Sequence, residues 1–142
     1  MTASQNSVVG GNIAVFYADD CEQDIAVMRA ASQRTPIQVA SVFPDRDTLL
    51  AGLRAAAERD ILPGAAICDL YMPGQSLEAF LHAVRADPAL ADLSIVVMSD
   101  SQGETATALT GDTGPSWFVR KPVRLTDLEN FLHDLAHRVQ DD

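Results

Sequence analysis

The sequence predicts an α/β domain in which a five-stranded parallel sheet carries helices on both faces, a doubly wound (βα)5 sandwich. Short apolar segments alternate five times with longer segments whose apolar residues recur at helical spacing. Right-handed helical crossovers between such strands build a parallel sheet with helices on both faces. Acidic and hydroxyl residues also stand where several short segments end, as expected at the ligand-binding edge of such a sheet. The 142 residues are enough for one domain with its own core.

The five strand segments are short apolar runs that turn-forming residues separate. They cover residues 12–18, 37–43, 65–69, 94–98 and 116–120. The fourth, SIVVM, is the clearest, because four apolar residues follow one another after its first position. The second, IQVASVF, alternates partly between apolar and polar residues, which also suits a strand.

The helical segments place apolar residues three and four positions apart, on one face. They cover residues 22–34, 47–60, 76–86, 103–110 and 126–139. Asp47 and Ser76 are the expected N-caps of the second and third segments. Thr126 and Glu129 form a capping box at the start of the last. The fourth segment has three threonines and a glycine, so it predicts a weak, short helix.

Composition and charge limit the function classes. The formal net charge of −10 argues against direct binding to nucleic acid, which requires Lys and Arg to neutralise phosphates. No apolar run approaches the ~20 residues of a membrane-spanning helix. We expect a flexible tail at 1–11, a domain at 12–139 and a frayed end at 140–142, without a signal peptide, and therefore a cytoplasmic protein that does not bind membranes. The two cysteines, Cys21 and Cys68, form no metal-ligand spacing and are expected to be free thiols.

Five polar residues follow or end the predicted strands, and they form the candidate site. They are Asp19, Asp20, Asp69, Ser99 and Lys121, the only lysine of the chain. The carboxyl ends of parallel strands meet at one edge of the sheet, so these side chains are expected to share one crevice.

Two adjacent aspartates that face a third carboxylate are costly unless a positive charge lies among them. A hard dication such as Mg²⁺ prefers oxygen ligands of this kind. Asp69 can then act as a nucleophile, as carboxylates do when an aspartyl phosphate forms. Lys121 and the Ser99 hydroxyl can neutralise or bind phosphoryl oxygens. Phosphoryl transfer needs little more than such positioning and charge neutralisation.

Four segments resemble the receiver (response-regulator, CheY-like) domain of two-component signalling, which has a flavodoxin-like fold. They are FYADD at 16–20, ICDLYMPG at 67–74, IVVMSD at 95–100 and WFVRKP at 117–122. The resemblance extends from about residue 13 to residue 139. The segment ADPALADLSIVVMSDS is also similar to stand-alone receivers associated with bacterial phytochrome kinases.

The resemblance implies a role for each acidic residue of the site. Asp69 would accept a phosphoryl group from a phosphohistidine of a sensor histidine kinase or a phosphotransfer protein. Asp20, Asp69 and the backbone carbonyl of Tyr71 would ligate Mg²⁺ (or Mn²⁺) directly. Asp19 would contribute through a water molecule.

The resemblance also implies a switch. Ser99 would bind a phosphoryl oxygen and move toward it, and Phe118 would turn inward into the space that Ser99 leaves. Lys121 would pair with Asp69 or its phosphate, and a cis peptide between Lys121 and Pro122 would direct it into the crevice. Trp117, the neighbour of Phe118, should face the other side of the sheet and pack there against a helix.

Two of the residues that depart from the receiver pattern are expected to modulate the site. Asp100 stands where receivers usually carry a small residue, and its carboxylate would either slow phosphorylation or point into solvent. Tyr71 is bulky beside the path of attack, so it is expected to restrict the hydrolytic water and lengthen the phosphorylated lifetime.

Three functions compete at this point. The first is a receiver without an attached output domain, which switches its binding to an unknown protein target. It would not be an enzyme acting on other substrates. It has a possible homodimer interface on the face formed by 103–110, the fifth strand and the last helix. The second is a pseudo-receiver that docks partners without being phosphorylated. The third is a haloacid-dehalogenase-type phosphohydrolase, but that class needs an aspartate two residues after the nucleophile, where this chain has Tyr71.

Overall fold

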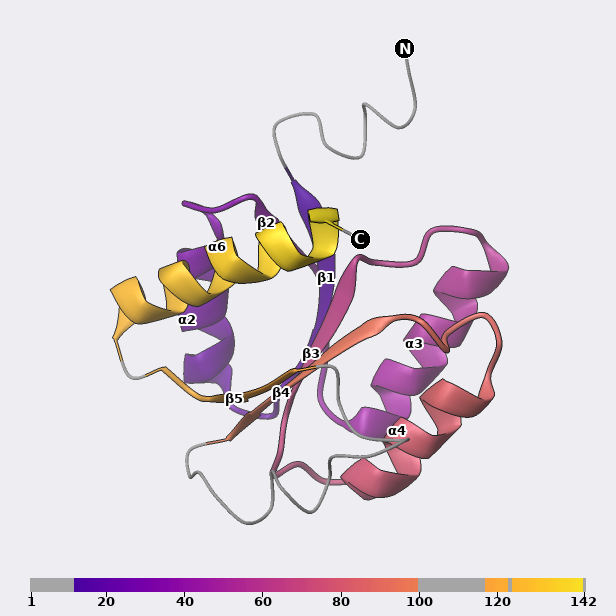
Figure 1. Ribbon diagram of the computed structural model, residues 1–142. Helices are drawn as coiled ribbons and strands as arrows, with labels where there is room; N and C mark the ends of the chain where they lie inside the picture. The colour runs from indigo at the N-terminus through magenta and orange to yellow at the C-terminus, as the bar shows by residue number, and fades with distance from the viewer. Residues whose placement is uncertain (1–11, 100–116, 123, 142) are drawn as a thin grey trace.

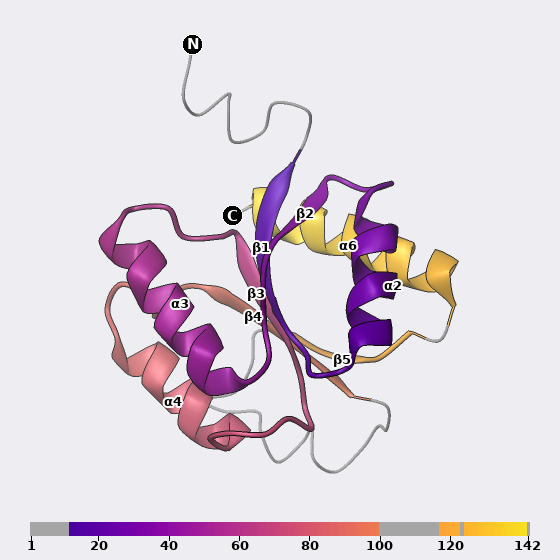
Figure 2. The ribbon, with the colours of Figure 1, turned by 180° about the vertical axis from the view of Figure 1, so that it is seen from behind.

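The computed structural model describes residues 12–99, 117–122 and 124–141. The described strands form one parallel sheet of order β2-β1-β3-β4-β5, and α2 and α6 cover one face while α3 and α4 cover the other (Figures 1 and 2). The elements are β1 Ile13–Ala18, α2 Glu22–Ser32, β2 Ile37–Phe43, α3 Arg46–Glu58, β3 Ala65–Asp69, α4 Leu77–Ala86, β4 Ser94–Ser99, β5 Trp117–Arg120 and α6 Leu125–Asp141. The predicted doubly wound α/β fold is therefore confirmed. The helix expected at 103–110 lies outside the described residues.

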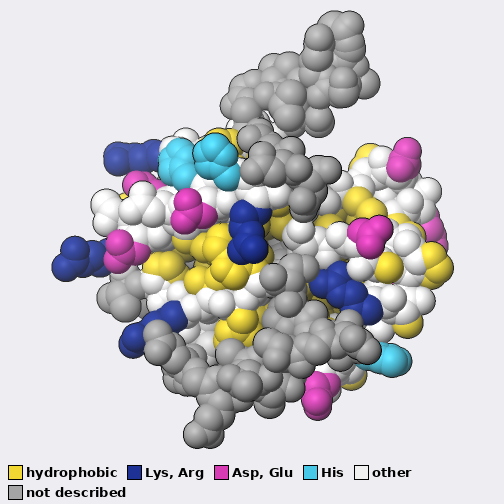
Figure 3. Space-filling model, in the orientation of Figure 1, with side chains coloured by type: hydrophobic (Ala, Val, Ile, Leu, Met, Phe, Trp, Pro, Cys, Tyr) yellow, Lys and Arg dark blue, Asp and Glu magenta, His cyan; other side chains and the backbone are white. Residues whose placement is uncertain are grey.

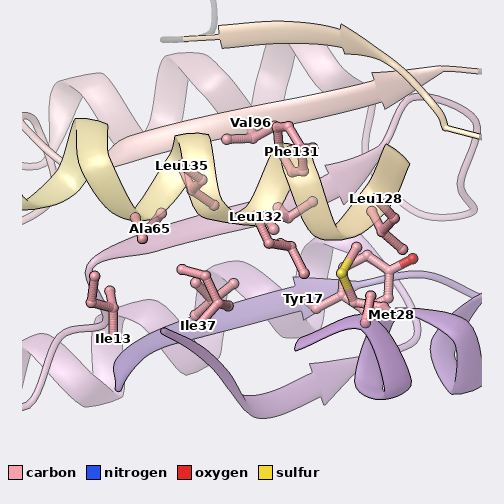
Figure 4. Packing of buried hydrophobic residues seen from close by; sticks show 14 of the residues in the cluster. Ile13, Tyr17, Met28, Ile37, Ala65, Val96, Leu128, Phe131, Leu132 and Leu135 are labelled. Atoms are coloured by element: carbon pink, nitrogen blue, oxygen red, sulfur yellow. The ribbon is translucent and has the colours of Figure 1, made fainter. Parts of the chain in front are cut away.

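The alternation of side chains along each strand divides the core into two layers. Tyr17, Ile67 and Met98 belong to the layer under α2 and α6, whereas Cys68 and Val97 belong to the layer under α3 and α4. Figure 4 shows how the apolar stripe of α6 closes the first layer. Its buried members on α6 are Leu128, Phe131, Leu132, Leu135 and Ala136.

Helix starts agree with the sequence only in part. Ser76 is the N-cap of α4, and its hydroxyl accepts a hydrogen bond of 3.1 Å from the Ala79 N–H. The N-cap expected at Asp47 is wrong, because α3 begins earlier and Asp45 accepts from the Thr48 N–H at 2.7 Å. Likewise α6 begins at Leu125, so Thr126 lies inside its first turn and is not its N-cap. No helix of the described ranges is both long and apolar enough to cross a membrane.

The two aromatic residues of β5 face opposite sides of the sheet, as predicted. Trp117 packs on α6, with its ring centroid 5.0 Å from that of Phe131 and 4.1 Å from the guanidinium carbon of Arg138. Phe118 is half-buried and packs against the layer under α3 and α4. The role of Phe118 as a switch stays a prediction.

The strand order also fixes where a ligand site can form. From β1 the chain crosses to β2 on one side and then returns to β3 on the other, so the winding direction reverses between β1 and β3. In open α/β sheets the crevice beyond the carboxyl ends of strands at such a reversal is the usual ligand site.

Candidate functional site

Asp19 and Asp69 lie side by side at this reversal. Asp69 ends β3, and Asp19 directly follows β1, whose last residue Ala18 pairs with Cys68. Lys121 follows β5, and its backbone N–H donates a 2.7 Å hydrogen bond to the carbonyl of Ser99 at the end of β4. Parallel pairing therefore brings residues about 100 positions apart in the chain, 19 and 121, to one edge of the sheet.

The Lys121 ammonium joins the acidic residues into one cluster. Its Nζ lies 3.1 Å from Asp69 Oδ2, 3.3 Å from Asp19 Oδ2 and 2.6 Å from Asp24 Oδ2. The peptide between Lys121 and Pro122 is not cis, so that expectation is wrong. The side chain reaches the carboxylates from a trans backbone whose N–H is fixed on Ser99.

Asp24 is a member of this cluster that the sequence did not reveal. It comes from the first turn of α2 and not from a strand end. An aspartate in a first helical turn is ordinarily explained by its favourable interaction with the helix dipole. Its place in a first helical turn gave no indication that its carboxylate would pair with Lys121.

Asp19 is held on both carboxylate oxygens. The Tyr17 hydroxyl donates to Oδ2, and the Cys21 backbone N–H donates to Oδ1 at 2.9 Å. Burial, helped by the hydrogen bond to Asp19, raises the pKa of the Tyr17 hydroxyl well above its usual value. The hydroxyl therefore stays protonated and remains a donor to this buried carboxylate. Tyr17 was predicted only as a strand residue.

A buried arginine supports the loop after Asp69. The guanidinium of Arg46, the first residue of α3, donates to the backbone carbonyls of Asp69 at 2.9 Å, Leu70 at 3.2 Å and Gln75 at 3.0 Å. Only 4% of Arg46 is exposed. An arginine at a helix start has no sequence signature of burial, so this role was missed.

Three of the remaining predicted residues lie at or just after the ends of β1, β3 and β4. Ser99 is buried at the end of β4, and Tyr71 is exposed in the loop after β3. Asp20 is exposed and is not among the carboxylates that lie close together. Asp100 lies outside the described residues. The assigned roles of these four residues stay predictions.

The donor set suits a hard divalent cation. Asp19, Asp24 and Asp69 each offer a carboxylate oxygen, and these oxygens lie within 4.8 Å of one another. Mg²⁺ and Mn²⁺ prefer such oxygen ligands. The residues therefore fit the predicted cation, with Asp24 as an additional acidic neighbour.

Burial and the neighbouring charges shift two ionisations in the site. Burial raises the pKa of Asp69, and the hydrogen bond from Lys121 opposes that shift. Burial would lower the pKa of Lys121, but its hydrogen bonds to Asp24 and Asp69 outweigh this effect and raise it. The ionised form of Asp69 is therefore a cost to folding at neutral pH, and this cost is relieved as the pH falls through the folded pKa.

We accordingly expect Asp69→Asn to increase the free energy of unfolding at pH 7 in the presence of a chelator. The amide removes a desolvated negative charge that faces Asp19. Urea unfolding midpoints of the two proteins check this, with Asp134→Asn on the exposed side of α6 as the control, expected within about 0.5 kcal/mol of wild type. A lower midpoint for Asp69→Asn would contradict the expectation.

Comparisons with known proteins bear on the fold. No protein-family model matches the chain, and no curated protein matches it either. Among solved structures, the phosphorylated cyanobacterial phytochrome response regulator RcpA superimposes with a TM-score of 0.74 at 22% identity, over 91% of this chain and 94% of that one. Response regulator RPA3017, from red-light signalling in R. palustris, gives 0.75 at 19% identity, over 88% and 92%. The Mn²⁺-bound response regulator Rcp1 gives 0.69 at 16% identity, over 87% and 91%.

The chain thus has an α/β sandwich with an acidic cluster at its switch point. Its fold is that of response-regulator receiver domains, and the predicted CheY-like receiver fold is confirmed. Regulators of phytochrome signalling are among the similar structures, as the segment around β4 suggested. At these sequence identities the likeness concerns the fold alone.

Proposed function

We propose that this protein is a response-regulator receiver that accepts a phosphoryl group on Asp69 in a Mg²⁺-dependent reaction. One observation carries the proposal: the Asp69 carboxylate lies at the switch point, 3.1 Å from the only lysine and close to Asp19. Structural neighbours that were captured phosphorylated and with Mn²⁺ support it. The donor is a phosphohistidine on a sensor histidine kinase or a phosphotransfer protein.

In the transfer, an Asp69 carboxylate oxygen attacks phosphorus, an O–P bond forms and the P–N bond to the donor imidazole breaks. The leaving nitrogen keeps the bonding electrons and takes up a proton, so the donor histidine is regenerated. Lys121 is close enough to Asp69 to neutralise charge on the phosphoryl oxygens. The cation, when bound, neutralises further charge on those oxygens and would be held by Asp20, Asp69 and the Tyr71 carbonyl, with Asp19 acting through water.

The proposed output is a change in protein binding. Ser99 would follow the phosphoryl group, and Phe118, which is half-buried against the layer under α3 and α4, would repack behind it. Tyr71 and Asp100 would adjust the rates of phosphorylation and hydrolysis. The protein would act in the cytoplasm on a protein target, and it would not turn over a metabolite. β5 and α6 belong to the candidate homodimer face, together with the segment 103–110.

Direct contact with nucleic acid or membrane is not part of the proposal. The formal net charge is −10. On the face in Figure 3 the Lys and Arg side chains lie apart and are interspersed with acidic ones, so they form no basic patch there. Strong binding to DNA requires many such contacts to phosphates.

Incubation with acetyl phosphate and Mg²⁺ tests the proposal. We expect wild type to gain about 80 Da, the mass of one phosphoryl group, by intact mass spectrometry, and we expect no gain with Asp69→Asn or in excess chelator. Asp134→Asn, an exposed aspartate on α6, should gain the same mass as wild type. An unmodified wild type would favour a docking pseudo-receiver, and sustained turnover of a phosphorylated metabolite would favour a phosphohydrolase.

A further inference from the structure

Lys121 lies closer to Asp24 than to Asp69, the residue with which it is expected to pair. Its Nζ is 2.6 Å from Asp24 but 3.1 Å from Asp69 and 3.3 Å from Asp19. Asp24 belongs to α2, whereas the other members of the cluster lie at the ends of strands. One ammonium is therefore shared among three carboxylates, and the helix supplies the one that holds it most closely.

A phosphoryl group on Asp69 would change this balance. The acyl phosphate would carry about −1.5 to −2 charges at pH 7 in place of the single charge of the Asp69 carboxylate, and this is more than the single charge of the Asp24 carboxylate. Because Coulomb attraction scales with charge at equal distance, the phosphorylated side of the cluster would draw Lys121 away from Asp24. Asp24 opposes that movement, and its negative charge also repels an incoming anionic phosphodonor.

The surroundings of the pair leave space for such a movement. A cavity of about 300 Å³ borders Asp24 and Lys121, with Tyr17, Met28 and Leu128 also in its wall. Figure 4 shows Tyr17 and Met28 together below Leu128 in this region. The Asp24 side chain is 39% exposed while that of Lys121 is 15% exposed, so Asp24 can turn into solvent when Lys121 leaves it.

We propose that Asp24 is a positioning residue that holds Lys121 in the resting state and competes for it with the phosphoryl group on Asp69. This inference rests on the proposed receiver function. Asp24 thereby slows phosphorylation of Asp69 and shortens the lifetime of the phosphorylated form. Receivers without an acidic residue at this helical position would lack this restraint.

Asp24→Asn tests the proposal when it is compared with two other variants, Asp24→Glu and Glu22→Gln. Asp24→Glu retains the charge and should restore the behaviour of wild type in part. Glu22→Gln removes an exposed carboxylate from the same helical turn, so it controls for net charge and for the helix dipole. The readouts are the rate of phosphorylation by acetyl phosphate at saturating Mg²⁺ and the rate at which the phosphoryl group is lost after donor removal.

We expect Asp24→Asn to be phosphorylated about threefold to fivefold faster than wild type and to lose the group more slowly by a similar factor, since partly exposed ion pairs have effects of this size. Glu22→Gln should match wild type.

A second readout does not depend on the reaction. Lys121 is the only lysine, so its ammonium gives a single side-chain ¹⁵N NMR signal. Asp24→Asn should move that signal toward the position that beryllofluoride, a phosphoryl mimic, produces in wild type.

Equal rates and an unchanged lysine signal in Asp24→Asn would overturn the inference. Slower phosphorylation at saturating Mg²⁺ would overturn it too, because Asp24 would then assist the reaction. If wild type gains no phosphoryl group, the proposed function fails and this inference fails with it. If wild type gains the group but Asp24→Asn behaves identically, only this inference fails.

Discussion

Replacement of Arg46 by methionine is expected to lower the free energy of unfolding by about 3 kcal/mol. The substitution leaves the backbone carbonyls of Asp69, Leu70 and Gln75 without the guanidinium that donates to them. A buried carbonyl without a donor costs about 1–3 kcal/mol, and methionine fills the space but donates nothing. The loss of the desolvated guanidinium itself offsets part of this cost.

Arg54→Met on the same helix is the matched control. Its side chain is 52% exposed and its Nε lies 3.7 Å from Asp87 Oδ2, an arrangement that contributes about 0–1 kcal/mol. Urea unfolding measures the free energy of unfolding of the two variants, and equal slopes of the curves allow their midpoints to be compared directly. Equal midpoints for Arg46→Met and wild type would show that the loop after Asp69 does not depend on the guanidinium.

Arg46 also connects the fold to the site. It joins the start of α3 to the strand end that carries Asp69 and to the residues just after it. The guanidinium only partly offsets the effect of burial on Cys68, whose pKa is raised to about 12, so this thiol remains protonated. Cys68 is therefore a buried neutral thiol beside Asp69, as the sequence suggested.

The features that follow from the topology of the sheet could be predicted from the sequence. Alternation of strands and helices dictates a parallel sheet, and a parallel sheet dictates that Asp19, Asp69 and Lys121 meet at one edge. The expected helix starts at Asp47 and Thr126 were less accurate, because several polar residues before each helix can act as the cap and the backbone decides among them.

Contacts made by side chains that leave their own element were not predictable. Asp24 on α2 and Arg46 on α3 have the residue types that are common on exposed helix starts. Whether such a side chain turns to solvent or into the site depends on the angle at which its helix crosses the sheet. The spacing of apolar residues in the sequence does not predict this angle. Tyr17 was predicted as a strand residue, but the partner of its hydroxyl depends on the turn that follows β1.

These missed contacts share one physical cause. The predicted strand-end residues bring several negative charges to one edge with a single ammonium. Such a cluster is costly unless neighbouring elements orient it, and functional sites commonly retain a cost of this kind. Tyr17 fixes Asp19, Arg46 fixes the loop after Asp69, and Asp24 fixes Lys121.

Lys121→Met should therefore reveal how strongly the cluster depends on its one ammonium. In excess chelator we expect the free energy of unfolding to fall by about 2 kcal/mol, less than the 3–5 kcal/mol of a fully buried pair because Asp24 is partly exposed. The pKa of Lys121 is raised, so its stabilising effect is complete at neutral pH and is lost only as the pH rises through the folded pKa. The deficit should accordingly be the same at pH 7 and pH 8.

Excess Mg²⁺ should remove most of that deficit, because a dication bound beside Asp19 and Asp69 supplies the positive charge that the variant lacks. Arg120→Met removes the exposed neighbouring charge and should change stability by no more than about 0.5 kcal/mol with or without Mg²⁺. Urea unfolding of wild type and both variants, each in chelator and in Mg²⁺, measures these differences. A Lys121→Met protein as stable as wild type in chelator would mean that the three carboxylates do not need the ammonium. A deficit that Mg²⁺ leaves unchanged would mean that the site does not bind the cation.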